Sequence, residues 1–250
     1  MNPFRKNSKQ LSIFVTAGYP NVNALPSQIE FLEKNGIDFI EVGVPFSDPM
    51  ADGPTIQGSS EIALQNGMSV SLLFEQLTTV NPKIPLVIMS YFNPILHFGL
   101  DRFLEQCNKV NVAHVILPDI SLEVYEKLYR STFEKFGVSI CFLVTPRTSS
   151  DRIAKMSTYS SNGFIYLVSS SMTTGNSVAK IESHEVERIR AAAGDTPLMI
   201  GFGIKSRENL LDVHQKADGA IIGSAYIKAL GEGREQEFIS SVSAPEPQNL

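Results

Sequence analysis

The sequence has only two cysteines and four histidines among its 250 residues. Cys107 and Cys141 lie far apart, in apolar or helical settings, which is typical of structural thiols rather than of a disulfide, a metal site or a nucleophile. The histidines also lack the spacing of a ligand set; they are His97, His114, His184 and His214. The sequence therefore predicts no metal.

Basic charge and long apolar runs are also missing. A net charge of -5 and a pI near 5.4 argue against binding nucleic acid, which needs a basic surface for the phosphates. No apolar run approaches the length of a membrane span, and residues 1–10 are polar, with no hydrophobic signal region. We therefore expect a cytoplasmic protein that binds neither nucleic acid nor membranes. Its hydrophobic fraction of 43% is enough for a full core.

What the chain does have is a regular alternation of short apolar segments and longer amphipathic ones. The segments that resemble buried strands are Leu11–Thr16, Phe39–Val44, Leu86–Tyr91, His114–Leu117, Ser139–Val144, Phe164–Val168, Leu198–Gly201 and Gly219–Ile222. The helical stretches between and after them are Ala24–Asn35, Thr55–Asn66, Ser69–Val80, Asp101–Val110, Leu122–Phe136, Ser150–Tyr159, Ser183–Ala193 and Arg207–Gln215. Because parallel strands need helical crossovers and a closed sheet leaves no edge, this pattern predicts a (β/α)8 TIM barrel.

An open, doubly wound sheet is the alternative architecture. No Gly-x-Gly-x-x-Gly turn follows the first strand, and eight strands is the number of a closed barrel, so the barrel is favoured. No shift in composition marks a linker. We expect a single domain over residues 1–250, in which residues 244–250 are a frayed tail.

The most informative stretch is residues 37–57. Glu41 lies in the middle of an apolar strand, where a carboxylate survives either as a hydrogen-bonded structural group or as a titrating group with a raised pKa. A proline-rich loop follows and carries Asp48 and Asp52, each of which alone would be explained as a turn or capping residue. Together, strand and loop can bring Glu41 and Asp52 into one cavity at the strand's C-terminal end, a setting for acid–base chemistry.

Three late loops are rich in residues that bind phosphate. Residues 169–175 follow the sixth strand, Gly201–Ile204 follows the seventh, and Gly223–Ala225 follows the eighth and opens a short helix. Glycine lets backbone N–H groups approach an anion, and a helix N-terminus directs its dipole at it. One such turn would mean little. Two in succession predict a phosphate cradle, because barrels commonly hold phosphate after these strands.

Apolar and aromatic residues lie near the same barrel mouth. Phe14, Met89 and Ile116 are inward strand residues, and Tyr91 and Tyr166 lie near strand ends. Such residues are most often packing, although together they would also form a flat apolar pocket. A phosphate site, an apolar slot and two acids suggest a substrate with a phosphate at one end and an aromatic or apolar group at the other. The bond to be altered would lie between them.

Several of these stretches, in order, resemble the tryptophan synthase alpha subunit family; they are Phe14–Pro20, Glu41–Pro49, Ala51–Gln57, Gly201–Ile204 and Gly223–Ala225. The resemblance covers almost the whole chain. It implies a (β/α)8 barrel that cleaves indole-3-glycerol phosphate to indole and glyceraldehyde 3-phosphate without a cofactor of its own. It also implies an α2β2 complex, whose beta subunit uses pyridoxal phosphate to condense the indole with serine.

Position by position, the resemblance implies that Glu41 is the general acid–base and that Asp52 accepts a hydrogen bond from the indole N–H. The implied phosphate-binding residues are Gly175, Phe202, Gly203, Gly223 and Ser224. The implied pocket residues are Phe14, Ile56, Met89, Tyr91, Ile116, Tyr166 and Thr174, the last bonding Asp52 when the loop after the sixth strand closes. Asp48 and Asn93 would lie in loops that face the beta subunit.

The loop after the sixth strand departs from the family pattern, which is close to Ser-Arg-x-Gly-Val-Thr-Gly. Ser170 replaces the arginine and Met172 a hinge-like glycine, so we expect a stiffer loop without a charged anchor. Ser121 also stands where a proline is common. A second hypothesis is therefore a catalytically weakened alpha subunit that mainly activates the beta subunit. A third, a sugar-phosphate isomerase or epimerase, would not require the stretch from Glu41 to Asp52.

Overall fold

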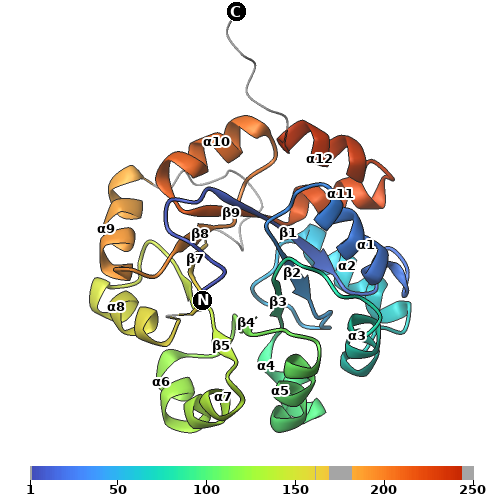
Figure 1. Ribbon diagram of the computed structural model, residues 1–250, viewed down its shortest axis with the longest axis horizontal. Coiled ribbons are helices and arrows are strands. Elements are labelled where there is room, and N and C mark those ends of the chain that lie inside the picture. Colours follow the sequence, from blue (N-terminus) through green and yellow to red (C-terminus); the bar gives the residue numbers. More distant parts are fainter. Residues whose placement is uncertain (1, 161, 169–181, 244–250) are drawn as a thin grey trace, which may run out of the picture.

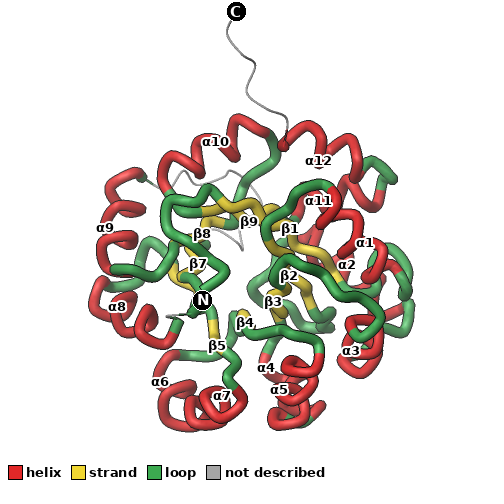
Figure 2. The backbone as a smooth tube through the Cα atoms, in the orientation of Figure 1, coloured by secondary structure: helices red, strands yellow, loops and turns green. Residues whose placement is uncertain are grey.

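Strands and helices alternate around a ring in the computed structural model, which describes residues 2–160, 162–168 and 182–243 (Figure 1). The strands lie inside and the helices outside, as the backbone tube shows (Figure 2). The strands are β1 (Gln10–Thr16), β2 (Phe39–Gly43), β3 (Leu86–Met89), β4 (His114–Ile116), β5 (Ser139–Ile140), β6 (Leu143–Val144), β7 (Ile165–Leu167), β8 (Leu198–Ile200) and β9 (Gly219–Ile222).

The parallel sheet closes on itself. Its order is β5-β4-β3-β2-β1-β9-β8-β7-β6, and the two end strands belong to one short stretch, residues 139–144. Within that stretch the N–H of Cys141 donates to the carbonyl of Val115 at 2.8 Å, while the carbonyl of Phe142 accepts from the N–H of Tyr166 at 2.9 Å. The stretch thus pairs with β4 on one side and with β7 on the other. The predicted eight-stranded barrel is confirmed, and its fifth strand consists of two short segments, β5 and β6.

Helices cover the outer face of the ring. They are α1 (Ala24–Lys34), α2 (Pro54–Gln65), α3 (Val70–Leu77), α4 (Phe92–Phe98), α5 (Leu100–Lys109), α6 (Leu122–Val124), the π-helical turn η1 (Tyr125–Tyr129), α7 (Arg130–Phe136), α8 (Ser150–Tyr159), α9 (Ser183–Ala193), α10 (Arg207–Lys216), α11 (Ser224–Gly231) and α12 (Glu235–Ser243). All eight predicted helical stretches are found, and α11 is the expected short helix. None of the helices in the described ranges has the length and apolar character needed to cross a membrane.

The helices α4 and α12 were not predicted, and the third strand is shorter than expected. It was predicted to reach Tyr91 but ends at Met89, and Tyr91 instead precedes the first residue of α4. The N–H of Phe92, at the start of α4, donates to the Asp119 carboxylate at 2.9 Å. A residue from the loop after β4 therefore caps this helix, and such a long-range partner cannot be identified from local sequence.

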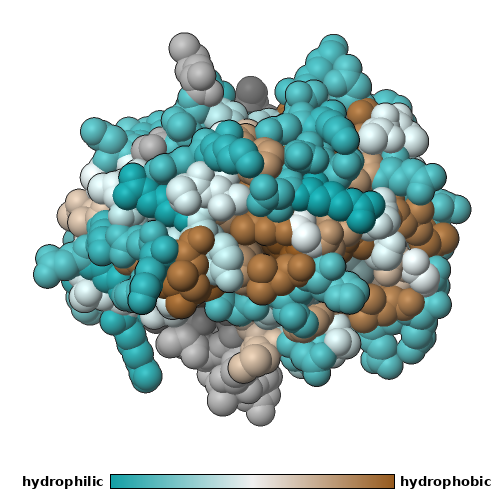
Figure 3. Space-filling model, turned by 90° about the horizontal axis from the view of Figure 1, so that it is seen from below, coloured by the Kyte–Doolittle hydropathy of each residue, from teal (hydrophilic) through white to brown (hydrophobic). Residues whose placement is uncertain are grey.

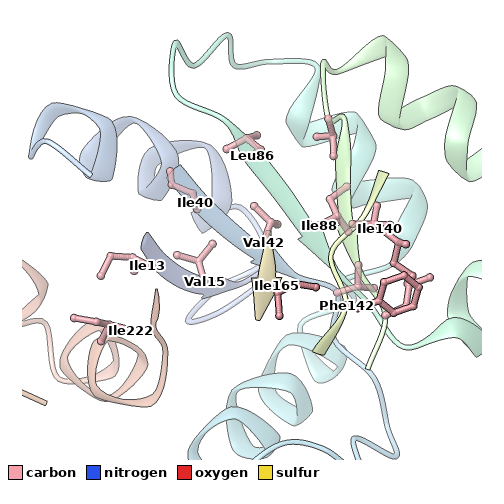
Figure 4. Close-up of a cluster of buried hydrophobic side chains, with 14 of the residues drawn as sticks. Ile13, Val15, Ile40, Val42, Leu86, Ile88, Ile140, Phe142, Ile165 and Ile222 are labelled. Atoms are coloured by element: carbon pink, nitrogen blue, oxygen red, sulfur yellow. The ribbon is translucent and has the colours of Figure 1, made fainter. Parts of the chain in front are cut away.

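Alternate strand residues point to the two sides of the barrel wall. The outward set packs beneath the helices; Figure 4 shows Ile13, Val15, Ile40, Val42, Leu86, Ile88, Ile140, Phe142, Ile165 and Ile222 from this layer. The inward set includes Phe39 and Phe164, and Phe4 packs on both with ring centroids 5.0 and 4.8 Å away. Phe4 thus fills the N-terminal end of the barrel, toward which the chain start lies (Figure 1). Both cysteines are buried and unpaired.

Candidate active site

A cavity of about 770 Å³ lies at the C-terminal ends of the strands. Its lining brings together ten of the residues predicted for the site: Phe14, Glu41, Asp52, Ile56, Met89, Tyr166, Phe202, Gly203, Gly223 and Ser224. These residues come from both halves of the chain, and the barrel places them together because all parallel strands end at the same face.

Glu41 lies at the inner wall of this cavity, in the middle of β2. It is only 1% exposed, and among the described residues its Oε2 has no hydrogen-bond partner. Burial, aided by the nearby charge of Asp52, raises the Glu41 pKa from its ordinary 4.5 to about 8. Glu41 is therefore protonated at neutral pH and has an oxygen free to bond a ligand.

Asp52 lies on the loop between β2 and α2, held by backbone bonds. Its N–H donates to the Pro49 carbonyl at 3.1 Å, and its own carbonyl accepts from the Gln57 side chain at 2.8 Å. Burial raises the Asp52 pKa to about 6, and a hydrogen bond from Tyr91 opposes that shift. At neutral pH Asp52 is thus ionised while Glu41 is protonated, a separation of pKa values that is typical of an acid–base pair.

Two of the predicted pocket residues do not line the cavity. The Tyr91 hydroxyl accepts a hydrogen bond from the Ala51 N–H at 2.8 Å and also bonds the Asp52 side chain. Tyr91 therefore positions the loop between β2 and α2 without lining the cavity. Ile116 is fully buried among the inward side chains of the barrel, such as Val87. The residue pattern showed that both face inward but not how deep along the barrel axis each lies.

The apolar part of the lining depends on two glycines. Phe14 packs with Ile56 and Ile227 near the barrel mouth, and a Cβ at Gly43 would overlap the Phe14 ring. A Cβ at Gly201 would overlap the Tyr166 side chain in the same way. These glycines leave room for two rings that line a flat slot.

Gly201→Ala is expected to lower the free energy of unfolding by about 1–3 kcal/mol, since the new methyl group must displace buried Tyr166. Gly58→Ala is the matched control. Gly58 lies within α2 and a Cβ there meets nothing within 4 Å, so this change is expected to be neutral or to stabilise by up to about 1 kcal/mol. Urea unfolding of both variants measures the difference, and equal effects would contradict the proposed packing.

Glycine, serine and a helix N-terminus form the other end of the cavity. Gly203 has a φ of +67°, the left-handed region that favours glycine. Gly223 precedes α11, and the first intrahelical bond runs from the Ile227 N–H to the Gly223 carbonyl. The N–H groups of the first turn, beginning at Ser224, therefore have no partner in the helix and suit an anion.

Some predicted residues lie outside the described ranges. Thr174 and Gly175 are among them, as are Ser170 and Met172 and the tail 244–250. Their expected roles in loop closure and phosphate binding stay predictions. Within the described part of the chain, no three or more His, Cys, Asp and Glu side chains gather as metal ligands would.

The two predicted partner contacts lie on the rim of the barrel. Asp48 and Asn93 are exposed and follow neighbouring strands, β2 and β3. Met50, two residues from Asp48, is 85% exposed. Further exposed apolar residues lie on the side of the molecule formed by α4 to α7, where Figure 3 shows apolar surface; they are Leu96, Val124 and Leu128.

Sequence reasoning missed one wall of the cavity. Phe238 and Ser241, three residues apart on α12, line it, as do Lys205 and Lys228. The spacing in α12 indicates a shared helix face, but nothing in the sequence indicated that this face meets the cavity.

Comparison with known proteins identifies the family. The family model described as tryptophan synthase alpha chain matches residues 2–246. The chain belongs to this family. The tryptophan synthase alpha chain of Flavobacterium psychrophilum is 47% identical over 243 residues, which cover 96% of this chain and 94% of that protein. That of Flavobacterium johnsoniae is 45% identical over 245 residues, covering 95% and 96%.

Solved structures agree. A structure of Mycobacterium tuberculosis tryptophan synthase matches with a TM-score of 0.86 at 32% identity, covering 95% of this chain and 92% of that one. A mutant tryptophan synthase alpha subunit from the hyperthermophile Pyrococcus furiosus matches with a TM-score of 0.85 at 28% identity, covering 96% and 98%. The predicted family and the predicted TIM barrel are both confirmed. The family works with a beta subunit.

Proposed function

We propose that the cavity at the barrel mouth is where this chain cleaves indole-3-glycerol phosphate to indole and glyceraldehyde 3-phosphate, with Glu41 and Asp52 as its acid–base groups. Membership of the tryptophan synthase alpha chain family supports the activity, a lyase step of tryptophan biosynthesis. The single observation that carries the proposal is the pair of carboxyls on one cavity, buried Glu41 and half-buried Asp52, with separated pKa values.

Glu41 would move the protons of the reaction. It gives its proton to C3 of the indole ring, which turns the ring into an electron sink, and its carboxylate then takes the proton of the neighbouring side-chain hydroxyl. The carbon–carbon bond breaks, its electrons enter the ring, and the hydroxyl carbon becomes an aldehyde. One proton leaves Glu41 and one returns, so the residue ends as it began. Its protonated state at neutral pH supports this order of events.

Asp52 would accept a hydrogen bond from the indole N–H. Because its pKa is raised only to about 6, it carries a negative charge at neutral pH and would stabilise the positive charge that develops on the ring. Phe14, Ile56 and Met89 line the same cavity and would hold the flat ring by apolar contact. Tyr91 would act by positioning the Asp52 loop.

The substrate phosphate would bind at the glycine-rich end. The cavity lining there offers the backbone of Phe202, Gly203 and Gly223 and both the N–H and the hydroxyl of Ser224. Gly175, in the loop after β7, would complete the phosphate site, and Thr174 would bond Asp52 when that loop closes.

The expected partner is a beta subunit in an α2β2 heterotetramer in the cytoplasm. Pyridoxal phosphate would belong to that subunit, and this chain would need no cofactor of its own. The exposed rim around Asp48 and Asn93, with Met50 on the same loop as Asp48, supports a contact there, because an apolar side chain that is 85% exposed gains stability when a partner covers it.

Indole release from indole-3-glycerol phosphate by the purified chain, alone and with its cognate beta subunit, tests the proposal. Release that rises when the beta subunit is added is the expected result. No release in either case, while the beta reaction is still accelerated, would favour the second candidate, an activating subunit. Ser170 and Met172, which depart from the family pattern in the closing loop, are the observation behind that candidate.

A further inference from the structure

Two lysines lie in the cavity lining, and one of them, Lys228, is near enough to Glu232 for its charge to help lower the pKa of that carboxyl. Lys205 follows β8 and Lys228 lies on α11, and neither side chain makes an ion pair or a hydrogen bond within the described ranges. Arg234, a third cation of the lining, differs because it is already bonded to Glu232. The lysines are exposed, so their ammonium groups are available to an anion that approaches from solvent.

Each of these lysines stands next to a residue of the proposed phosphate cradle. Lys205 follows Gly203 by two residues. Lys228 follows Ser224 by four residues, which places both on one face of α11, a single turn apart. The two cations therefore lie on two of the chain segments that would build the cradle, one on each.

The rest of the charge distribution works against an anionic substrate. The chain has a formal net charge of -5, and the cavity lining contains the carboxyl groups of Asp52 and Glu237 in addition to the protonated Glu41. A phosphate ester that carries nearly two negative charges is repelled by such a field at low ionic strength. Two unpaired cations at the mouth of a cleft reverse the local field, because the low-dielectric walls concentrate it.

We propose that Lys205 and Lys228 together form a cationic gate, meaning a pair of positive charges that attracts the phosphate dianion of the substrate into the cavity. The phosphate then binds to the backbone cradle. The inference rests on the proposed function, since it takes the phosphate-bearing substrate as given. The lysines contribute to association and affinity and have no part in the proton transfers at Glu41. They set a preference for substrates with a doubly charged phosphate over those with a neutral end.

The test uses Lys205→Gln, Lys228→Gln and the double variant, compared with Lys34→Gln. Lys34 is exposed at the C-terminal end of α1, on the opposite face of the barrel, and its substitution makes the same change in net charge. At low ionic strength each single variant is expected to lower kcat/KM for indole-3-glycerol phosphate about 3- to 10-fold and the double variant about 10- to 50-fold. The kcat is expected to stay within about 2-fold. Salt at about 0.5 M should shrink the difference, because it screens exposed charges.

Calorimetric titration with glycerol 3-phosphate measures the same gate without turnover. We expect weaker binding by the double variant and unchanged binding by Lys34→Gln. If the chain cleaves indole-3-glycerol phosphate and the double variant matches Lys34→Gln at every salt concentration, the gate is overturned and the function stands. If the wild-type chain cleaves no indole-3-glycerol phosphate, and the double variant still binds glycerol 3-phosphate more weakly, the gate is supported and the proposed function is wrong. If the wild-type chain neither cleaves indole-3-glycerol phosphate nor binds glycerol 3-phosphate, both proposals are wrong.

Discussion

Glu41→Gln is expected to abolish indole release, with kcat lowered by about 10²- to 10⁴-fold. The amide has nearly the shape of the carboxyl group but can neither give nor take the proton of the reaction. The fold should persist, because Glu41 is only 1% exposed and already uncharged at neutral pH, so a neutral amide of nearly the same shape replaces a neutral carboxyl group. Indole release measured over time, with circular dichroism of the same sample, checks both statements.

The matched control is Glu61→Gln. Glu61 lies on the exposed face of α2, where its side chain accepts a hydrogen bond from Gln65 of the same helix. This variant is expected to release indole at the wild-type rate. If Glu41→Gln retained full activity, Glu41 would have no place in the mechanism, whatever its pKa.

Asp52→Asn is expected to lower kcat about 10²- to 10³-fold, because the charge that would stabilise the cationic ring is lost. A second effect should accompany it. The charge of Asp52 is one cause of the raised pKa of Glu41, so that pKa should fall in the variant, although burial, the larger cause, remains. Steady-state kinetics and the pH dependence of the residual activity measure the two effects.

Asp195→Asn serves as the control for that experiment. Asp195 is exposed in the turn between α9 and β8, at the opposite end of the barrel from the cavity. It changes the net charge of the chain by the same amount and should leave kcat unchanged. Equal kinetics for the two aspartate variants would mean that Asp52 is only a loop residue.

The fold could be predicted from the sequence because the hydrophobic periodicities of strands and helices are local features of the chain. Eight apolar segments and eight amphipathic ones could be recognised, and the closed parallel sheet follows from their number and order. The additions it missed depend on contacts between distant segments. The start of α4 is capped by Asp119, which lies after the next strand, and α12 lies against α11 and α10 rather than between two strands.

The sequence showed which side of its strand each site residue faces, but not how far along the barrel axis the residue lies. A carboxylate at position 41 in an apolar strand could be recognised as unusual, and the structure gives it the burial that raises its pKa. Alternation along a strand shows that Tyr91 and Ile116 lie on the inward side, but their height along the barrel axis depends on the stagger of the strands. Lys205 and Lys228 could be recognised as residues of the site only from the structure, because it is the fold that brings them to the same cavity.

The pKa of Glu41 is the quantity on which the mechanism depends. An ordinary glutamate is ionised by pH 5 and could not give a proton to the indole ring at pH 7. Since the Glu41 pKa is raised to about 8, the group is a proton donor across the neutral range and loses that ability as the pH rises through 8. The pKa of Asp52, about 6, sets the lower limit at which its stabilising charge is present.

Carbon NMR of the chain labelled at the glutamate carboxyl carbons, titrated from pH 4 to pH 10 without substrate, tests this most directly. We predict that one carboxyl resonance titrates near pH 8 and that it is missing from the spectrum of Glu41→Gln. If every glutamate resonance instead titrates near pH 4 to 5, Glu41 is ionised at neutral pH, and the proposed proton transfer to the indole ring is contradicted.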